Sequence, residues 1–179
     1  FLAITRLYAP TIVQVLVRGY IDIFRSIPLL VLLIVVYYAL PFVGIRLSPF
    51  FSAVTALTLV SAAYTAEIFR AGIEAIPHGQ FEASAALGLS NRHTMVDVIL
   101  PQAIRIVIPP LTNNCINVMK DTALASVVAM PDLLKQATQA QALSANPTPL
   151  IGAALIYLIL LWPMVYVVAR LEKRYSRGR

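Results

Sequence analysis

Long apolar runs constrain this chain more than any other feature of its sequence. Of its 179 residues, 59% are hydrophobic and only 12% are charged, and the mean hydropathy is +0.80. A soluble domain carries roughly 25% charged residues, so this chain lacks the polar side chains needed to cover a globule. Several runs approach the ~20 apolar residues that a membrane-spanning helix needs. The sequence therefore predicts an all-α, polytopic transmembrane helix bundle, taken as a single domain over residues 1–179.

Four apolar segments are expected to be membrane helices. They run over residues 27–43, 50–69, 104–130 and 150–169. Residues 1–27 carry charges between apolar residues, which indicates an amphipathic or membrane-entry segment. Pro109 and Pro110 are expected to break the third membrane segment, because proline removes a helix hydrogen bond. No signal peptide is visible, and because the first residue is Phe1 we expect the chain to be N-terminally incomplete.

A polar insert at residues 70–105 separates the second and third membrane segments, and its side of the membrane follows from the basic residues. If the insert faces the cytoplasm, eleven basic residues lie on that side, namely Arg6, Arg18, Arg25, Arg70, Arg92, Arg105, Arg170, Lys173, Arg174, Arg177 and Arg179. Only Arg46 and Lys135 then lie outside. Lysine and arginine favour the cytoplasmic side, so the insert and the C-terminus are predicted to be cytoplasmic. The net charge of +6 is explained in this way without nucleic acid.

Within the insert, residues 77–101 are predicted to form a short helix, a tight turn and a second helix. Residues 80–87 are mostly good helix formers. Gly88 suits a helix C-terminus that needs a positive φ. Ser90 is placed to cap the second helix, and Pro101 is expected to end it.

This helix pair is expected to expose a compact surface of small and apolar side chains. Its members are Phe81, Ala85, Leu87 and Leu89. Such a surface, with one aromatic anchor, fits a groove of a soluble partner. The alternative is an amphipathic loop that lies on the lipid surface.

Polar residues at membrane depth form a second candidate site. Ionisable groups there are costly, so they are paired or line an aqueous path. Lys120 and Asp121 are adjacent and do not face each other on a helix, so they have different partners or lie in non-helical backbone. Asn113 and Asn117 share a helix face, and hydrogen bonds between helices are an alternative role for them. The candidate pathway residues are Tyr64, Asn113, Asn114, Asn117, Lys120, Asp121 and Thr122.

The remaining polar residues give weaker signals. Glu67 and Arg70 are predicted to form a local i,i+3 ion pair at the membrane surface. His78 and His93 make a poor metal site without nearby Cys or carboxylates. The single cysteine, Cys115, is expected to be a small buried hydrophobe. No glycine-rich phosphate loop occurs, so the chain is not expected to hydrolyse ATP itself.

Several motifs together resemble one family of membrane proteins. Glu82-Ala83-Ser84, Gly88 and Ile99-Leu100-Pro101 resemble the Glu-Ala-Ala…Gly…Ile-x-Leu-Pro signature of bacterial ABC importer permeases, with Ser84 in place of the second alanine. Further matches are RSIPLL (25–30), YTAEIFR (64–70), PHGQ (77–80), LPQA (100–103), PPLTN (109–113) and KDTAL (120–124). These resemble permeases for polar amino acids and opines, although Ala123 stands where that family has serine. The resemblance covers about residues 6–172.

The resemblance implies a fold, partners and a function. The fold would be that of a type I ABC importer permease with a cytoplasmic coupling loop. The loop residues that would dock on a separate ATPase are Phe81, Glu82, Ala83, Ser84, Ala86, Leu87, Gly88 and Pro101. ATP and Mg²⁺ would be bound by that ATPase, and this chain would bind no cofactor. A second permease subunit, identical or different, and an extracytoplasmic solute-binding protein would complete an amino acid importer in the bacterial inner membrane.

Two rival functions remain at this point. An intramembrane enzyme would need paired catalytic groups at membrane depth, and Asp121 stands alone there. A secondary transporter often has repeated halves with matching broken helices, and the sequence shows no such repeat.

Overall fold

The computed structural model describes residues 2–176, and every regular element in this range is helical, as predicted. Its first half comprises α1 (Leu2–Tyr8), α2 (Thr11–Ser26), α3 (Leu29–Ile34), the π-helical turn η1 (Val35–Ala39), the 3₁₀ turn η2 (Leu40–Val43) and α4 (Pro49–Glu74). Its second half comprises α5 (His78–Ala86), α6 (Asn91–His93), the π-helical turn η3 (Thr94–Ile99), α7 (Leu100–Asp121), the 3₁₀ segment η4 (Thr122–Val128), α8 (Leu133–Ser144) and α9 (Thr148–Ser176). Arg177 and Arg179 lie outside the described residues.

Three of these helices are long and apolar enough to cross a membrane. They are Pro49–Glu74, Asn91–Val128 and Thr148–Arg174. Helices Thr11–Ser26 and Leu29–Val43 pass the same test only together, and they are bent by 100° relative to each other. Three of the four predicted membrane segments are therefore confirmed as span-length helices, whereas the segment expected at 27–43 is helical but reaches span length only as part of the bent pair.

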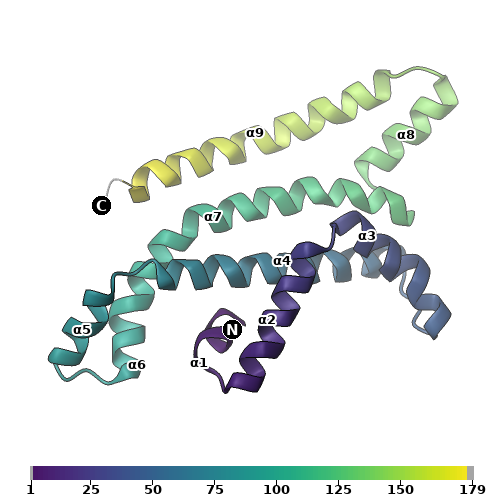
Figure 1. Ribbon diagram of the computed structural model, residues 1–179. Coiled ribbons are helices and arrows are strands. Elements are labelled where there is room, and N and C mark those ends of the chain that lie inside the picture. The colour runs from purple at the N-terminus through teal and green to yellow at the C-terminus, as the bar shows by residue number, and fades with distance from the viewer. Residues whose placement is uncertain (1, 177–179) are drawn as a thin grey trace.

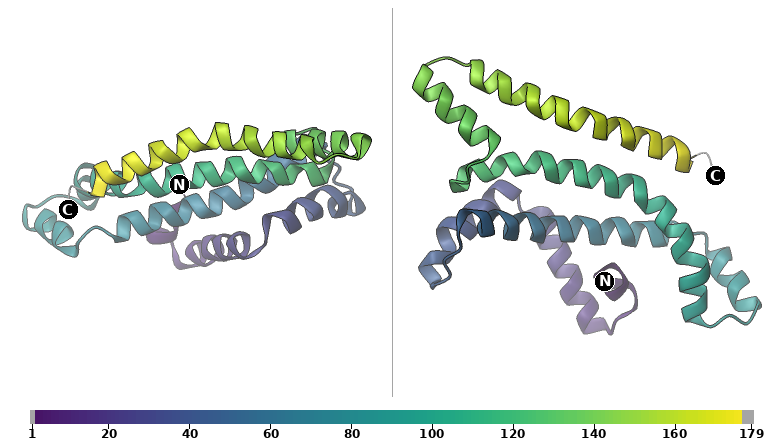
Figure 2. Two further views of the ribbon diagram at one scale, coloured as in Figure 1. Left: turned by 90° about the horizontal axis from the view of Figure 1, so that it is seen from above. Right: turned by 180° about the vertical axis from the view of Figure 1, so that it is seen from behind.

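The long helices lie side by side. Figure 1 shows α4 and α7 running in opposite directions along each other, with α9 on the far side of α7, and both views of Figure 2 agree. Helices α5 and α6 project at one end, which also holds the C-terminal end of α9 (Figure 1). The opposite end holds α3 and α8. The loop predicted between the second and third membrane segments is therefore a separate feature at one end of the bundle.

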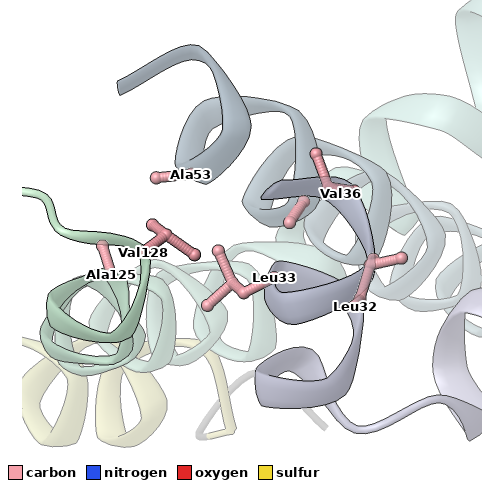
Figure 3. Close-up of a cluster of buried hydrophobic side chains, with 7 residues drawn as sticks. Leu32, Leu33, Val36, Ala53, Ala125 and Val128 are labelled. Atoms are coloured by element: carbon pink, nitrogen blue, oxygen red, sulfur yellow. The ribbon is translucent and has the colours of Figure 1, made fainter. Parts of the chain in front are cut away.

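Apolar clusters fix both ends of the bundle. The cluster far from α5 joins α3 and η1, α4 and η4 (Figure 3), and its buried residues are Leu32, Leu33, Val36, Ala53, Ala56, Ala125 and Val128. The cluster at the α5 end is formed by Ile73, Ile76, Ile99 and Ala103. Alanines at the first cluster let the helix backbones approach closely, as small residues do between membrane helices.

Gly72 sets the closest approach between α4 and α7. It is buried, and a Cβ atom built on it would clash with Cγ2 of Val107 and lie 3.5 Å from the carbonyl oxygen of Ala103. Val107 is itself only 2% exposed, so its side chain has no free space to move into. The absence of a side chain at position 72 is therefore a packing requirement of this helix pair.

The expectation that Pro109 and Pro110 break the third membrane segment is wrong. Both lie inside α7, and Asn91–Val128 is one helix of 38 residues. Proline is tolerated inside membrane helices because neighbouring groups can satisfy the freed carbonyls. In the same stretch of α7, the hydroxyl of Thr112 donates to the carbonyl oxygen of Ile108 at 2.7 Å.

We predict that Gly72→Ala destabilises the bundle by about 1–3 kcal/mol, the usual cost of overpacking a full contact. The double variant Gly72→Ala with Val107→Ala should recover part of this loss, because it removes the clashing methyl group. Thermal unfolding of the purified protein in detergent measures both effects. Gly152→Ala is the matched control, since Gly152 lies in α9 with nothing within 4 Å of a Cβ atom. Equal losses for Gly72→Ala and Gly152→Ala would contradict the packing explanation.

Candidate functional site

The first helix of the loop ends in a Schellman motif. Gly88 has φ +73°, its N–H donates to the carbonyl of Ala85 at 2.9 Å, and the N–H of Leu89 donates to the carbonyl of Ser84 at 3.1 Å. These are the two bonds of that motif, which needs a left-handed residue at this position. The predicted turn at Gly88, with its positive φ, is confirmed.

The second helix begins as predicted but does not end as predicted. Ser90 is its N-cap, and its hydroxyl accepts the N–H of His93 at 3.4 Å. Pro101 was expected to end this helix, and that expectation is wrong. The π-helical turn η3 precedes Leu100, so Pro101 falls at the start of α7, where the missing N–H costs little. The loop therefore connects rigidly into α7.

The exposed face of α5 and the turn after it includes one glutamate, three alanines and two leucines. Glu82, Ala83, Ala85 and Ala86 are exposed on α5, and Leu87 and Leu89 after it are 79% and 38% exposed. Gly88 has open space around it, since a Cβ atom there would meet nothing within 4 Å. The predicted exposure of Ala85, Leu87 and Leu89 is thus confirmed.

Phe81 and Ser84 face the chain itself. Phe81 is half-buried and packs against the Ile73, Ile76, Ile99 and Ala103 cluster, so the prediction that it is an exposed member of the loop surface is wrong. Ser84 is 3% exposed, and its hydroxyl donates to the carbonyl of Gln80 at 2.7 Å. The reason is the rotation of α5: residues 81 and 84, one turn apart, lie on its inner face.

A side-chain contact also joins α5 to the start of α7. Nε2 of Gln102 donates to Oε1 of Gln80 at 3.3 Å and to the carbonyl of Val98 at 2.8 Å. Together with the apolar cluster, this contact connects both helices of the loop. Helix α5 is thus held against the ends of both α4 and α7.

A polar cavity lies between α3, α4 and α7. It has a volume of about 300 Å³, and its polar lining residues are Ser61, Tyr64, Asn114, Asn117, Lys120 and Asp121. Five of the seven predicted pathway residues are thus brought together. Lys120 and Asp121 form no ion pair with another described residue. Both remain in helical backbone, with Asp121 the last residue of α7, so the non-helical alternative is wrong.

The asparagines that line the cavity are not the pair expected to share a helix face. Asn114 and Asn117 line the cavity, whereas Asn113 is exposed and does not. Asn114 also donates from Nδ2 to Oγ1 of Thr65 at 3.4 Å, an interhelical bond of the kind given as the alternative role. Thr122 also lies outside the cavity lining. It is exposed, and its hydroxyl donates to the carbonyl of Met119 at 2.7 Å.

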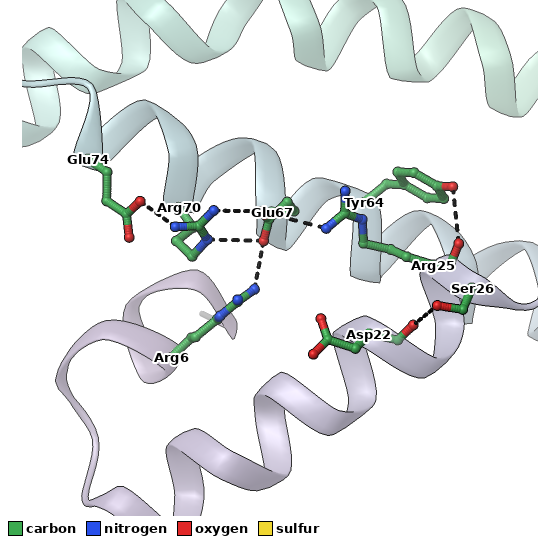
Figure 4. Close-up of polar contacts among 8 residues, drawn as sticks. All are labelled: Arg6, Asp22, Arg25, Ser26, Tyr64, Glu67, Arg70 and Glu74. Atoms are coloured by element: carbon green, nitrogen blue, oxygen red, sulfur yellow. Dashed lines mark hydrogen bonds and ion pairs between the residues drawn. The ribbon is translucent and has the colours of Figure 1, made fainter.

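Glu67 forms the predicted ion pair with Arg70, with shortest N···O distance 2.5 Å, and two further contacts that sequence reasoning missed. Figure 4 shows Arg6 from α1 and Arg25 from α2 directed at the same carboxylate, at 2.6 and 3.6 Å. Arg70 also pairs with Glu74. The alternating charges of residues 1–27 were visible in the sequence, but nothing local links positions 6 and 25 to position 67.

Other titratable residues make no site. The described residues hold no group of three or more His, Cys, Asp or Glu side chains placed to bind a metal. His93 contacts Asp97 at 2.9 Å on the surface of the second loop helix. Cys115 is exposed, so its predicted burial is wrong.

The sequence is similar to a known family of membrane transport proteins. The family model described as "Binding-protein-dependent transport system inner membrane component" matches residues 1–177. The chain is 40% identical over 166 residues to the probable glutamine ABC transporter permease protein GlnM of Bacillus subtilis (strain 168), covering 92% of this chain and 77% of that protein. It is 40% identical over 157 residues to the arginine transport system permease protein ArtQ of the same organism, covering 87% and 72%.

A solved structure is also similar. It is described as an amino acid ABC transporter with histidines, and it superposes with a TM-score of 0.91 at 35% identity over 97% of this chain and 82% of that chain. The type I permease fold predicted from the motifs is therefore confirmed.

We predict that Phe81→Ala loosens α5 from the bundle, because the ring packs on the Ile73 cluster. The cost should be about 2 kcal/mol, roughly half that of a fully buried phenylalanine. Hydrogen–deuterium exchange should rise in residues 78–87 and stay unchanged in α9. Leu87→Ala, which alters a side chain 79% exposed, is the control and should leave exchange unchanged. Similar exchange in both variants would show that Phe81 does not hold α5.

Proposed function

Because the chain belongs to the family of binding-protein-dependent transport system inner membrane components, as an amino acid ABC transporter permease, we propose that it forms the pathway for a polar amino acid and is driven by a separate ATPase. Proteins of this kind are transporter subunits and not enzymes. Relatives named for glutamine and for arginine support a polar amino acid as the substrate. The loop at one end of the α4–α7 pair is the observation that carries the proposal.

The coupling surface consists of the exposed loop residues. Glu82, Ala83, Ala86, Leu87 and Gly88 form a compact surface with small side chains, which suits insertion into a cleft of the ATPase. Helix α5 contains no lysine or arginine, which makes the lipid-surface alternative weaker. Phe81 and Ser84 hold the loop from within, and Pro101 begins the helix that leaves it.

The loop is connected so that its motion reaches the membrane. Helix α4 leads into α5, and the second loop helix continues without a break into α7. The cluster of Ile73, Ile76 and Ile99 packs these parts together. Movement of the loop by ATP-driven closure of the ATPase would tilt α4 and α7, whose facing residues line the cavity. Such tilting would alternate its opening between the two sides.

The cavity has the chemistry to receive an amino acid. A zwitterion needs a cationic donor for its carboxylate and an anionic acceptor for its ammonium group. Lys120 and Asp121 supply one of each, and the amides of Asn114 and Asn117 add donors and acceptors. Unpaired charges at membrane depth are typical of substrate paths. Tyr64 completes this wall, while Asn113 and Thr122 are left outside it.

The proposed complex and its orientation follow from the same features. Two permease subunits, identical or different, would pair in the bacterial inner membrane, two ATPase subunits carrying ATP and Mg²⁺ would bind the loops, and a solute-binding protein would deliver substrate from outside. The chain segment before α4, which contains Arg46, and helix α8, which contains Lys135, lie at the end opposite α5 (Figure 1), in line with a cytoplasmic loop and C-terminus. The chain would act as one permease domain, with no cofactor of its own and no nucleic acid partner.

The proposal predicts that the chain, reconstituted in proteoliposomes with a candidate ABC ATPase, shows ATPase activity stimulated by one loaded binding protein from an amino acid panel. Gly88→Val should abolish that stimulation and substrate uptake, because a β-branched residue is strained at φ +73° and would distort the docking surface. Gly79→Val is the control, since Gly79 is also exposed with open space but has no positive φ. No stimulation by any binding protein would reject the importer and favour an ion-gradient uptake assay.

The cavity predicts a difference between two asparagines one turn apart on α7. Asn117→Ala should lower maximal uptake at saturating loaded binding protein about tenfold, the value of one hydrogen bond to a charged group. Asn113→Ala should leave uptake unchanged, because Asn113 does not line the cavity. Radiolabelled uptake in the same proteoliposomes measures both. Equal rates for the two variants would exclude this cavity as the substrate path.

A further inference from the structure

The charge cluster around Glu67 is used neither by the coupling surface nor by the cavity lining. We propose that Glu67 is a positioning residue that makes α1, α2 and α4 move as one body when the coupling loop is displaced. This inference rests on the proposed function, because it concerns how the motion of the loop is transmitted.

The geometry of the cluster makes Glu67 its centre. One carboxylate accepts Nη1 of Arg6 at 2.6 Å and Nη2 and Nε of Arg70 at 2.5 and 3.0 Å, and it lies 3.6 Å from Nη1 of Arg25 (Figure 4). The three arginines come from α1, α4 and α2. Glu67 is thus the only described carboxylate in ion-pair contact with the two N-terminal helices.

The cluster is shielded enough for its charges to matter. The side chains of Glu67, Arg6 and Arg70 are 19%, 15% and 21% exposed. Breaking a shielded ion pair leaves a charge without its partner, which costs far more than breaking an exposed pair. Moving α1 away from α4 would do this to Arg6, and moving α2 away would remove the weaker contact of Arg25, which is 37% exposed. Their separation is therefore opposed, while movement of all three helices together is not.

The cluster also lies between the two functional regions. Towards the loop, Arg70 pairs with Glu74, three residues before Pro77. Towards the cavity, the guanidinium of Arg25 lies over the ring of Tyr64, 5.5 Å from its centroid, and the hydroxyl of Tyr64 donates to the carbonyl of Arg25 at 3.5 Å. Tyr64 is part of the cavity wall. Glu67 therefore joins the loop end of α4 to a residue beside the cavity through α2.

The test is the number of substrate molecules imported per ATP hydrolysed, measured in proteoliposomes with the ATPase and loaded binding protein. Glu67→Gln should lower this ratio about tenfold, because the loop would then move α4 without carrying α1 and α2. Glu67→Asp, which keeps the charge, should recover much of the loss. Glu74→Gln is the matched control: it makes the same change on the same helix but contacts only Arg70, and should alter the ratio by less than about twofold.

A second variant keeps the inference testable if Glu67→Gln does not fold. Arg6→Gln removes only the contact from α1 and should also lower the ratio. Where both fold, the double variant Arg6→Gln with Glu67→Gln should be no worse than Glu67→Gln alone, because residues that act through each other are not additive. Hydrogen–deuterium exchange should rise in residues 2–26 of either variant and not in α9.

The outcomes separate this inference from the proposed function. Wild-type protein without stimulated ATPase activity would reject the importer itself. If the wild type is coupled and Glu67→Gln imports as many substrate molecules per ATP, only the positioning role is rejected. Equal losses of this ratio in Glu67→Gln and Glu74→Gln would also reject only that role. A lower ratio in Glu67→Gln with unchanged exchange in α9, and with Glu74→Gln normal, would establish it.

Discussion

Close packing of α4 against α7 is the constraint on which the rest of the structure depends. The coupling loop is the connection between these two helices, and the polar cavity lies between their facing sides. Gly72 allows the approach at the loop end, and Ala53, Ala56 and Ala125 pack α4 against η4, the segment that follows α7, at the other end. Small residues matter here because lipid offers no hydrophobic force to drive helices together, so contact area has to supply the attraction. The position of both candidate sites follows from this one contact.

Two groups of charged residues differ in whether their side chains are paired. Glu67 shares its carboxylate among three arginines, and both of its oxygens are engaged by them. Lys120 and Asp121 line a cavity without an ion pair among the described residues. Only the second arrangement leaves donor and acceptor capacity for a ligand. The paired carboxylate of Glu67 therefore supports a mechanical role, and the unpaired Lys120 and Asp121 support a binding role.

Local rules predicted the loop well and the helix interiors poorly. Gly88 and Ser90 act on neighbours within one turn, so sequence alone located the Schellman turn and the N-cap. The same rules gave wrong predictions for three prolines. A preceding π-helical turn places Pro101 at the start of a helix, and the membrane environment tolerates Pro109 and Pro110 inside one. Phe81, Asn113 and Asn114 depend on how a helix is rotated about its axis, which spacing leaves undetermined. Arg6 and Arg25 depend on tertiary contacts with a residue about 40 to 60 positions away, which no single sequence reveals.

Helix 91–128 shows how the two sites can be linked without a hinge loop. One end of it is held by the Ile73 cluster beside the coupling loop, and the other end by the Leu33 cluster near η4. Between them, Pro109 and Pro110 remove two successive helix hydrogen bonds, so bending resistance is lowest there. Asn114, Asn117, Lys120 and Asp121 all follow this point on the side away from the loop. A bend at the prolines would therefore turn the cavity-lining part of α7 relative to its loop end, while backbone continuity carries the force between them.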